Sequence, residues 1–304
     1  MKKSIFDPIR KALEQARAKI RLRNMDKYST WSSQLYRFFV YSLQRPKMQL
    51  ENGMFIISVD VDVGSKELGI INGGQNDANV SSRFSEYSIG KVEEQALPLF
   101  IDLFNHFEIP VTFALRGQLT EVCNSVLDLF LKSPVKHDIG AHGYYHKKFN
   151  DLTHNEAQNE LKMISAGMER AGVIPRSFIF PRNKVAHLDL LAKYGYKCYR
   201  GYPLCTHIEK EGRLYNVHPS LFIDQSRSPK LLKGFVNLCI AKNVPFHVWF
   251  HLWNFGISKE SIRRNIDKLL FPVLKYAQQK VKSGALTFET MLSATEKVEK
   301  LRHN

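Results

Sequence analysis

The pattern of apolar and polar positions changes near residue 50. Before that point, apolar residues recur at intervals of three and four with Lys and Arg between them: Phe6, Ile9, Leu13, Ala16 and Ile20. This spacing predicts a basic amphipathic helix. A second aromatic and apolar segment, over 31–43, predicts another helix. We therefore expect a helical extension over residues 1–50 and one main domain over residues 51–304.

In the main domain, predicted strands and helices alternate. Stretches rich in Val, Ile and aromatic residues predict strands at 54–61, 110–114, 135–141, 177–180, 196–199, 245–252 and 285–288. Helices are predicted at 92–107, 119–131, 156–171, 185–194, 230–241 and 258–282, with a closing helix after the last strand. Strands separated by helices pair in parallel through right-handed crossovers. The fold class is therefore α/β, and seven such units close best into a barrel whose chemistry lies at the carboxyl ends of the strands.

Composition excludes several classes of protein. A chain of 304 residues that is 44% hydrophobic and 24% charged is globular rather than disordered. It has no run of the roughly 18 to 20 apolar residues that a membrane span needs. Its basic start reaches Asp7 and Arg10 before a signal-peptide core can form. Four cysteines without a C-x-x-C pair suit core thiols, so we expect a cytoplasmic protein.

The net charge of +15 is concentrated at the amino terminus. Residues 1–50 carry twelve Lys or Arg against Asp7, Glu14 and Asp26, which gives +9. One interpretation is that both predicted helices pack on the main domain and leave a solvated basic face. The other is that residues 1–45 dock on an anionic membrane surface or an acidic glycan, placing the protein on the inner face of the membrane. We expect no nucleic-acid partner, and the oligomeric state stays open.

Two predicted strands end in or are followed by side chains that can bind a metal ion, a pair of aspartates and a pair of histidines. In Asp60-Val61-Asp62 both carboxylates project from the same face of the strand as Ile56 and Ser58. Alone, such a pair is more often a turn or a cap. His142 and His146 are four residues apart, and glycines at 140 and 143 permit the chain to curl so that both imidazoles reach one ion. Such a pair is also often incidental, but one Asp and two His form a three-ligand catalytic set.

Two more residues near strand ends are candidates, His251 and Arg182. His247 and His251 are also four apart, but in a strand that spacing is roughly 13 Å, so they cannot share an ion. His251, nearer the carboxyl end and backed by Trp249 and Trp253, is the catalytic candidate; His247 is expected to be a hydrogen-bonded core histidine. Arg182 follows the strand that ends at Pro181, where it would orient a carboxylate, bind substrate or simply be exposed.

These motifs together resemble the polysaccharide deacetylases, the NodB-homology family of metal-dependent sugar deacetylases, in a divergent branch with an Asp-x-Asp first motif. The resemblance covers roughly residues 53–291. It rests on ordered segments: Ser58-Val59-Asp60-Val61-Asp62, Val111-Thr112-Phe113-Ala114, the segment from Asp138 to His146, Phe180-Pro181-Arg182-Asn183, Tyr194-Gly195-Tyr196-Lys197, His251, and Gly284-Ala285-Leu286-Thr287-Phe288. It implies a distorted (β/α)7 barrel.

The resemblance also implies roles for individual residues. It implies a divalent metal ion, with Zn²⁺ expected, held by Asp62, His142 and His146. Three catalytic roles follow by the same resemblance: general base for Asp60, general acid for His251, and orientation of Asp60 for Arg182. Such a site hydrolyses an acetyl amide, since an electrophilic ion, a base and an acid together serve water attack and amine departure.

The sequence departs from the family pattern at several points. Asp-Val-Asp replaces adjacent aspartates, so the choice of metal ligand between Asp60 and Asp62 stays open. Gly143 replaces a hydroxyl residue, and no Asp that could support the acid follows Tyr196. The expected function is deacetylation of an N-acetylated sugar in bacterial surface-polysaccharide metabolism. The alternatives are hydrolysis of a small cyclic amide on the same fold and a non-catalytic glycan-binding barrel.

Overall fold

The fold is built outward from one buried strand, β1 (Gly53–Val61). The computed structural model describes residues 31–44, 46, 50–61, 95–122, 124–201, 207–256 and 258–303. All nine residues of β1 are buried, as expected for a strand covered on both faces. One edge pairs with β9 (Pro245–His251). The other is shared: its first half pairs with β10 (Leu286–Glu289) and its second half with β2 (Thr112–Leu115), all in parallel.

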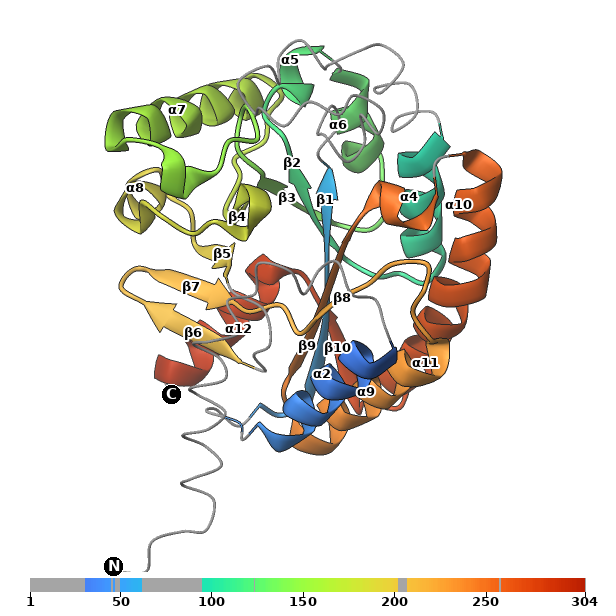
Figure 1. Cartoon of the computed structure of the whole chain (residues 1–304). Coiled ribbons are helices and arrows are strands. Elements are labelled where there is room, and N and C mark those ends of the chain that lie inside the picture. The colour runs from blue at the N-terminus through green and yellow to red at the C-terminus, as the bar shows by residue number, and fades with distance from the viewer. Residues whose placement is uncertain are drawn as a thin grey trace, which may run out of the picture.

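The remaining described strands extend this sheet into a half-barrel. They are β3 (Asp138–Ala141), β4 (Ser177–Ile179), β5 (Cys198–Arg200), β6 (Ile208–Glu211), β7 (Leu214–Val217) and β8 (Leu221–Phe222), in the order β6-β7-β5-β4-β3-β2-β1-β9-β8. Only the β6–β7 hairpin is antiparallel. Among the described strands, β6 and β8 form the two ends of this order and do not pair with each other. The predicted distorted (β/α) barrel is therefore confirmed (Figure 1).

Most helices lie in the connections between parallel strands. They are α4 (Leu97–His106), α5 (Leu119–Val122), α6 (Asn124–Leu131), α7 (His154–Arg170), α8 (Leu188–Lys193), α9 (Pro229–Lys242), α10 (Lys259–Asn265) and α11 (Phe271–Lys282). Helix α12 (Met291–His303) follows the last strand. The helix predicted over 258–282 is interrupted by a π-helical turn, Ile266–Leu270, between α10 and α11. The strands β6, β7 and β8 were not predicted from the sequence.

The closing helix α12 has a different place from the other helices. Its residues Met291, Ala294 and Val298 pack in one cluster with alternate residues of the strands, among them Ile56 and Cys198. These strand residues precede Ser58, Asp60 and Arg200 on the same face of their strands. Helix α12 therefore fills the half-barrel below the carboxyl ends of the strands, and leaves those ends for the site.

The helix predicted over 31–43 is present as α2 (Trp31–Leu43) and packs on the barrel. The Tyr41 hydroxyl donates to the carbonyl of Pro245, 2.9 Å away, and the Phe38 ring meets Phe235 edge-on with 5.1 Å between centroids. The basic helix predicted around residues 6–20 lies outside the described residues, so the boundary near residue 50 stays a prediction. Within the part of the chain that the structure describes, no helix is both long and apolar enough to cross a membrane.

Candidate active site

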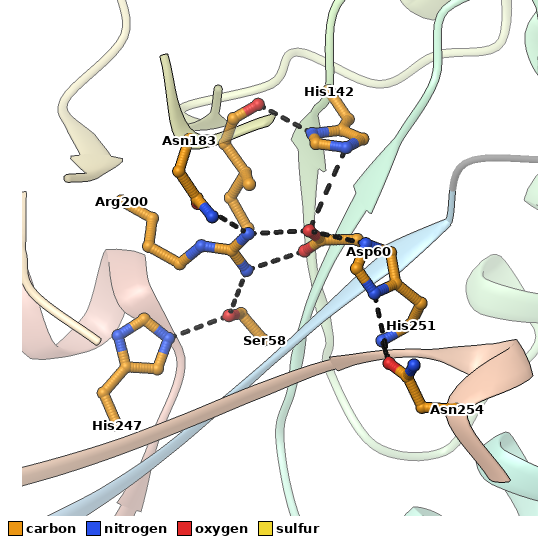
Figure 2. A network of polar contacts seen from close by, with 9 residues as sticks. Ser58, Asp60, His142, Asn183, Arg200, His247, His251 and Asn254 are labelled. Atoms are coloured by element: carbon orange, nitrogen blue, oxygen red, sulfur yellow. Dashed lines mark hydrogen bonds and ion pairs between the residues drawn. The ribbon is translucent and has the colours of Figure 1, made fainter. Parts of the chain in front are cut away.

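Polar side chains from distant parts of the chain meet at the carboxyl ends of the strands. Asp60 of β1 lies directly opposite His251 of β9 in the sheet register, and His142 follows the end of β3. Asp60 Oδ2 is 3.9 Å from His142 Nε2 and 3.7 Å from His251 Nε2 (Figure 2). Three of the residues selected from the sequence therefore face one another in a single site.

The carboxylate of Asp60 is held by a guanidinium, and that guanidinium belongs to Arg200. Arg200 Nη1 donates to Oδ1 and Nη2 to Oδ2, each at 2.6 Å. Both side chains are buried, at 2% exposure or less. Such a two-point contact fixes the plane of the carboxylate as well as its position. Arg200 therefore occupies the place that the sequence analysis assigned to Arg182.

Arg182 lies instead in a short 3-10 helix, Pro181–Asn183, that follows β4. Its backbone has φ of 59°, a left-handed conformation uncommon for a residue with a Cβ, and its side chain is exposed. The same turn places Asn183 so that its Oδ1 accepts from Arg200 Nη2 at 3.3 Å. The expectation that Arg182 orients Asp60 is corrected: this turn reaches Asp60 through Asn183 and Arg200.

Further contacts fix Arg200 itself. Its Nη1 also donates to Ser58 Oγ at 3.1 Å, and its guanidinium lies 4.2 Å from the centroid of the Trp249 ring. Ser58 and Asp60, two residues apart on β1, thus reach the same cation, as their predicted common face requires. A signal in the sequence could have found Arg200, because it directly follows the strand predicted at 196–199 and so also stands at a strand's carboxyl end.

Charges around Asp60 determine its ionisation. Burial alone raises the pKa of its carboxyl group, but the positive charge of Arg200, aided by His142 and His251, holds the pKa below its ordinary value. Asp60 is therefore ionised at neutral pH and can accept a proton. Since Arg200 takes up one side of each carboxylate oxygen, the geometry suits Asp60 as a base better than as a metal ligand.

The two histidines of the H-x-x-x-H motif share one curled loop. Gly143 has φ of 68° and His146 φ of 58°, so the chain turns back after β3 and brings the two rings to 4.9 Å between centroids. Of the two glycines expected to permit this curl, Gly143 does so. Gly140 lies within β3, where a Cβ would come within 2.8 Å of the Ser177 carbonyl oxygen.

The backbone of this loop is held from two sides. The buried carboxylate of Glu160, on α7, accepts from the amides of Tyr144 and Tyr145 at 2.7 and 3.0 Å. The buried guanidinium of Arg116, after β2, donates to the carbonyls of the same two residues at 3.4 and 3.5 Å. A loop with left-handed residues needs such support, because strained backbone persists only where its surroundings determine it. Neither Glu160 nor Arg116 was selected from the sequence.

The loop histidines have the chemistry of a metal site. His142 Nδ1 donates to the Ile179 carbonyl at 2.8 Å, so the lone pair of the ring lies on Nε2, which is the nitrogen directed toward Asp60. Burial, with the charges of His142 and Arg116, keeps the pKa of His146 well below its usual value, so this ring is neutral. No group of three or more His, Cys, Asp or Glu suited to a metal is found in the described ranges. The predicted third ligand, Asp62, lies outside them.

His251 stands in an aromatic setting. The Trp253 ring stacks on it at 4.8 Å between centroids and 24° between planes, and Trp249 meets it at 5.5 Å. Its Nδ1 lies 3.1 Å from Asn254 Oδ1, and its backbone amide donates to the same oxygen at 2.7 Å. The side-chain amide of Asn254 thus lies beside this histidine. The family resemblance led us to look for a supporting Asp, which the sequence lacks.

His247 is a buried, hydrogen-bonded core residue, as expected. Its Nδ1 donates to the Val217 carbonyl at 3.2 Å, and its Nε2 accepts from the Ser58 hydroxyl at 2.8 Å (Figure 2). Burial and the charge of Arg200 lower its pKa to about 3, which keeps the ring neutral. His247 thus extends the Asp60–Arg200–Ser58 network into the core.

Comparisons with known proteins indicate what this chain is similar to. Residues 84–199, which include His142 and His146 and end one residue before Arg200, match the family model described as polysaccharide deacetylase. Over 142 residues the chain is 23% identical to a peptidoglycan deacetylase of Helicobacter pylori, and the match covers 46% of each protein, so the chain spans about half the length of this relative.

Solved structures show the same fold. One described as a polysaccharide deacetylase from Mycobacterium smegmatis has a TM-score of 0.65 at 15% identity, covering 85% of this chain and 95% of the other. An allantoinase has a TM-score of 0.59 at 10% identity, covering 80% of this chain and 89% of the other. At these identities the likeness concerns the fold and does not distinguish between their substrates.

Proposed function

Since the chain belongs to the polysaccharide deacetylase family, we propose that it is a metal-dependent hydrolase that removes the acetyl group from an N-acetylated sugar of bacterial surface polysaccharide. The observation that carries this proposal is the meeting of an ionised carboxylate with two imidazoles. Asp60, held by Arg200, lies within 4 Å of both His142 and His251. A base, an acid and a metal-binding loop at one point are what amide hydrolysis needs.

We assign the proton transfers to two side chains. Asp60 takes a proton from the attacking water as the water oxygen bonds to the acetyl carbon. His251 gives a proton to the sugar nitrogen as the C–N bond breaks, so that acetate and a free amine leave. Trp249 and Trp253 enclose His251 and limit its contact with water, and Trp253 provides an aromatic face beside the acid.

Two described histidines would hold the metal, with Asp62 as the third ligand. His142 presents Nε2 and His146 is neutral, as metal ligation requires. When bound there, a divalent ion, with Zn²⁺ expected, supplies Lewis-acid polarisation of the acetyl carbonyl. His142→Ala and His146→Ala should each strip the ion, because two remaining protein ligands rarely retain it. Full metal content in both variants would overturn this assignment.

We also place the protein in the cytoplasm. Cys198 and Cys239 are buried free thiols, which suits a reducing compartment. Fractionation of cells that produce the full chain tests this placement. Recovery in an oxidising compartment with an intact fold would contradict it.

An acetate-release assay on metal-loaded protein tests the function. The substrate panel contains N-acetylated glycans, nucleotide sugars and a cyclic amide, with His251→Ala as the catalytic variant. We expect acetate from an acetylated sugar and a loss of roughly 10²- to 10⁴-fold in rate for the variant. Ring opening of the cyclic amide without acetate release would replace the proposal by the alternative hydrolase. Glycan binding without turnover would indicate a non-catalytic barrel.

A further inference from the structure

Helix α2 carries a stripe of apolar side chains on the face directed away from the barrel. Leu35, Tyr36, Phe39 and Leu43 are 45%, 37%, 57% and 51% exposed, and their spacing places them within one side of the helix. The opposite side packs inward, where Tyr41 is 3% exposed. We call these four residues the α2 stripe. A helix that is apolar on both sides needs a second apolar environment for its outer face.

The helices beside this stripe are basic and carry no acidic residue. Helix α9 packs against α2 at Gly234, where a Cβ would come within 3.1 Å of Phe38. Helices α9 and α11 contain no Asp or Glu, and their basic residues are Lys230, Lys233, Lys242, Lys275, Lys280 and Lys282. All six are exposed or half-buried. Figure 1 shows α2, α9 and α11 together at the end of the barrel away from the tip of β1.

Contacts join helix α9 to both α2 and α11. Lys242 Nζ donates to the carbonyls of Ser42 and Gln44 at the end of α2. Lys233 and Lys280, from α9 and α11, both lie over the ring of Tyr276 at 5.5 and 5.2 Å. Helix α2, which carries the α2 stripe, and the helices that carry the lysines therefore pack against one another.

We propose that the α2 stripe and the lysines of α9 and α11 form a docking surface for an anionic lipid bilayer. Apolar side chains enter the interface between headgroups and acyl chains, and the surrounding lysines meet anionic headgroups. Residues 1–30, which lead into α2, add nine Lys or Arg against three acidic residues. A phosphate backbone of nucleic acid would meet the lysines but leave the stripe in water, so lipid fits the whole surface better.

This surface lies far from the candidate active site. Tyr41 of α2 contacts Pro245, the first residue of β9, whereas His251 is the last. Seven strand residues at about 3.3 Å each separate the two by roughly 20 Å. A docked molecule therefore holds its active site away from the bilayer and open to the aqueous phase.

Vesicle sedimentation of the full-length protein tests the proposal. The probes are vesicles of phosphatidylcholine alone and vesicles that also contain phosphatidylglycerol. We expect binding only to the anionic vesicles, weakened by salt, because the attraction of the lysines is screened. Phe39→Ser with Leu43→Ser should weaken binding about tenfold or more, since both side chains lose their apolar contact. Lys230→Glu with Lys233→Glu should weaken it comparably at low salt.

Ile174→Ser is the matched control, because Ile174 is 64% exposed but lies after α7, away from these helices. It should bind vesicles like the wild type. Metal content and acetate release in solution should stay unchanged in every variant, which separates this test from that of the enzymatic proposal. Binding that survives the stripe substitutions, or a wild type that ignores anionic vesicles, overturns the proposal.

Two other occupants of the stripe give distinct results. A second copy of the chain would make the wild type dimeric by light scattering, and the stripe substitutions would make it monomeric without any vesicle binding. Residues 1–30 folded over the stripe would prevent vesicle binding until they are deleted. Either result would replace the lipid surface as the occupant.

Discussion

Replacing Arg200 by Met should destabilise the protein strongly, because it removes the only cation that contacts Asp60 in a two-point ion pair among the described residues. The lost contacts are two hydrogen bonds of 2.6 Å to Asp60 and one of 3.1 Å to Ser58. Asp60, 2% exposed, would then be buried without the cation that offsets the cost of burying its charge. Breaking a buried pair from one side costs about 3–5 kcal/mol.

A double-mutant cycle isolates this interaction. Asp60→Asn in the Arg200→Met background removes the unpaired charge, so the double variant should regain part of the lost stability. Arg200→Lys should fall between wild type and Arg200→Met, because an ammonium keeps the charge but cannot make the two-point contact. Arg213→Met is the control: Arg213 is exposed in the β6–β7 turn, and its loss should cost no more than about 0.5 kcal/mol.

The assay is urea unfolding followed by tryptophan fluorescence at pH 7.5, with metal-free protein so that metal release does not contribute. Unfolding free energies are compared only between variants with the same m value, which is the slope of the unfolding free energy against urea concentration. An Arg200→Met variant within about 1 kcal/mol of the wild type would refute the reasoning. So would a double variant that is no more stable than Arg200→Met, since the cost would then not arise from a stranded charge.

Three further predictions concern the metal loop, the core histidine and the base. Glu160→Gln should weaken metal affinity about 10- to 100-fold in chelator competition, because the loop loses its charged support, whereas exposed Glu169→Gln should not. His247 has a folded pKa of about 3 against 6.5 when unfolded, so stability should fall as pH drops from 6.5 toward 3, and His247→Gln should flatten that fall in urea midpoints. Asp60→Asn should keep its metal in elemental analysis yet lose roughly 10²- to 10⁴-fold in rate; an emptied site would instead make Asp60 a ligand.

Several features could be predicted from the sequence because they depend on local pattern. The alternation of apolar strands and amphipathic helices predicted a parallel α/β barrel. The structure confirms this fold, with the sheet curved into a half-barrel. Parallel strands end on the same side, so polar residues after a strand must gather at one edge. This reasoning selected Asp60, His142 and His251, and the structure places Asp60 within 4 Å of both histidines.

The identity of the partner of Asp60 was decided only by the tertiary structure. In the sheet, β5 is separated from β1 by β4, β3 and β2, so Arg200 reaches Asp60 because the half-barrel curves. Local sequence does not encode that curvature, and Arg182 and Arg200 both follow strands. The support of the His142 loop by Glu160 likewise depends on how α7 packs.

For helix α2, too, some features could be predicted from the sequence and others depend on the tertiary structure. Spacing alone predicted a helix over 31–43, because it depends on a periodicity within one segment. Which of its faces is covered depends on α9, a helix nearly 200 residues later in the chain. The sequence by itself thus determined the elements and the residues at their ends, whereas only tertiary packing decided which side chains meet and which faces stay exposed, since both depend on contacts between segments far apart in the chain.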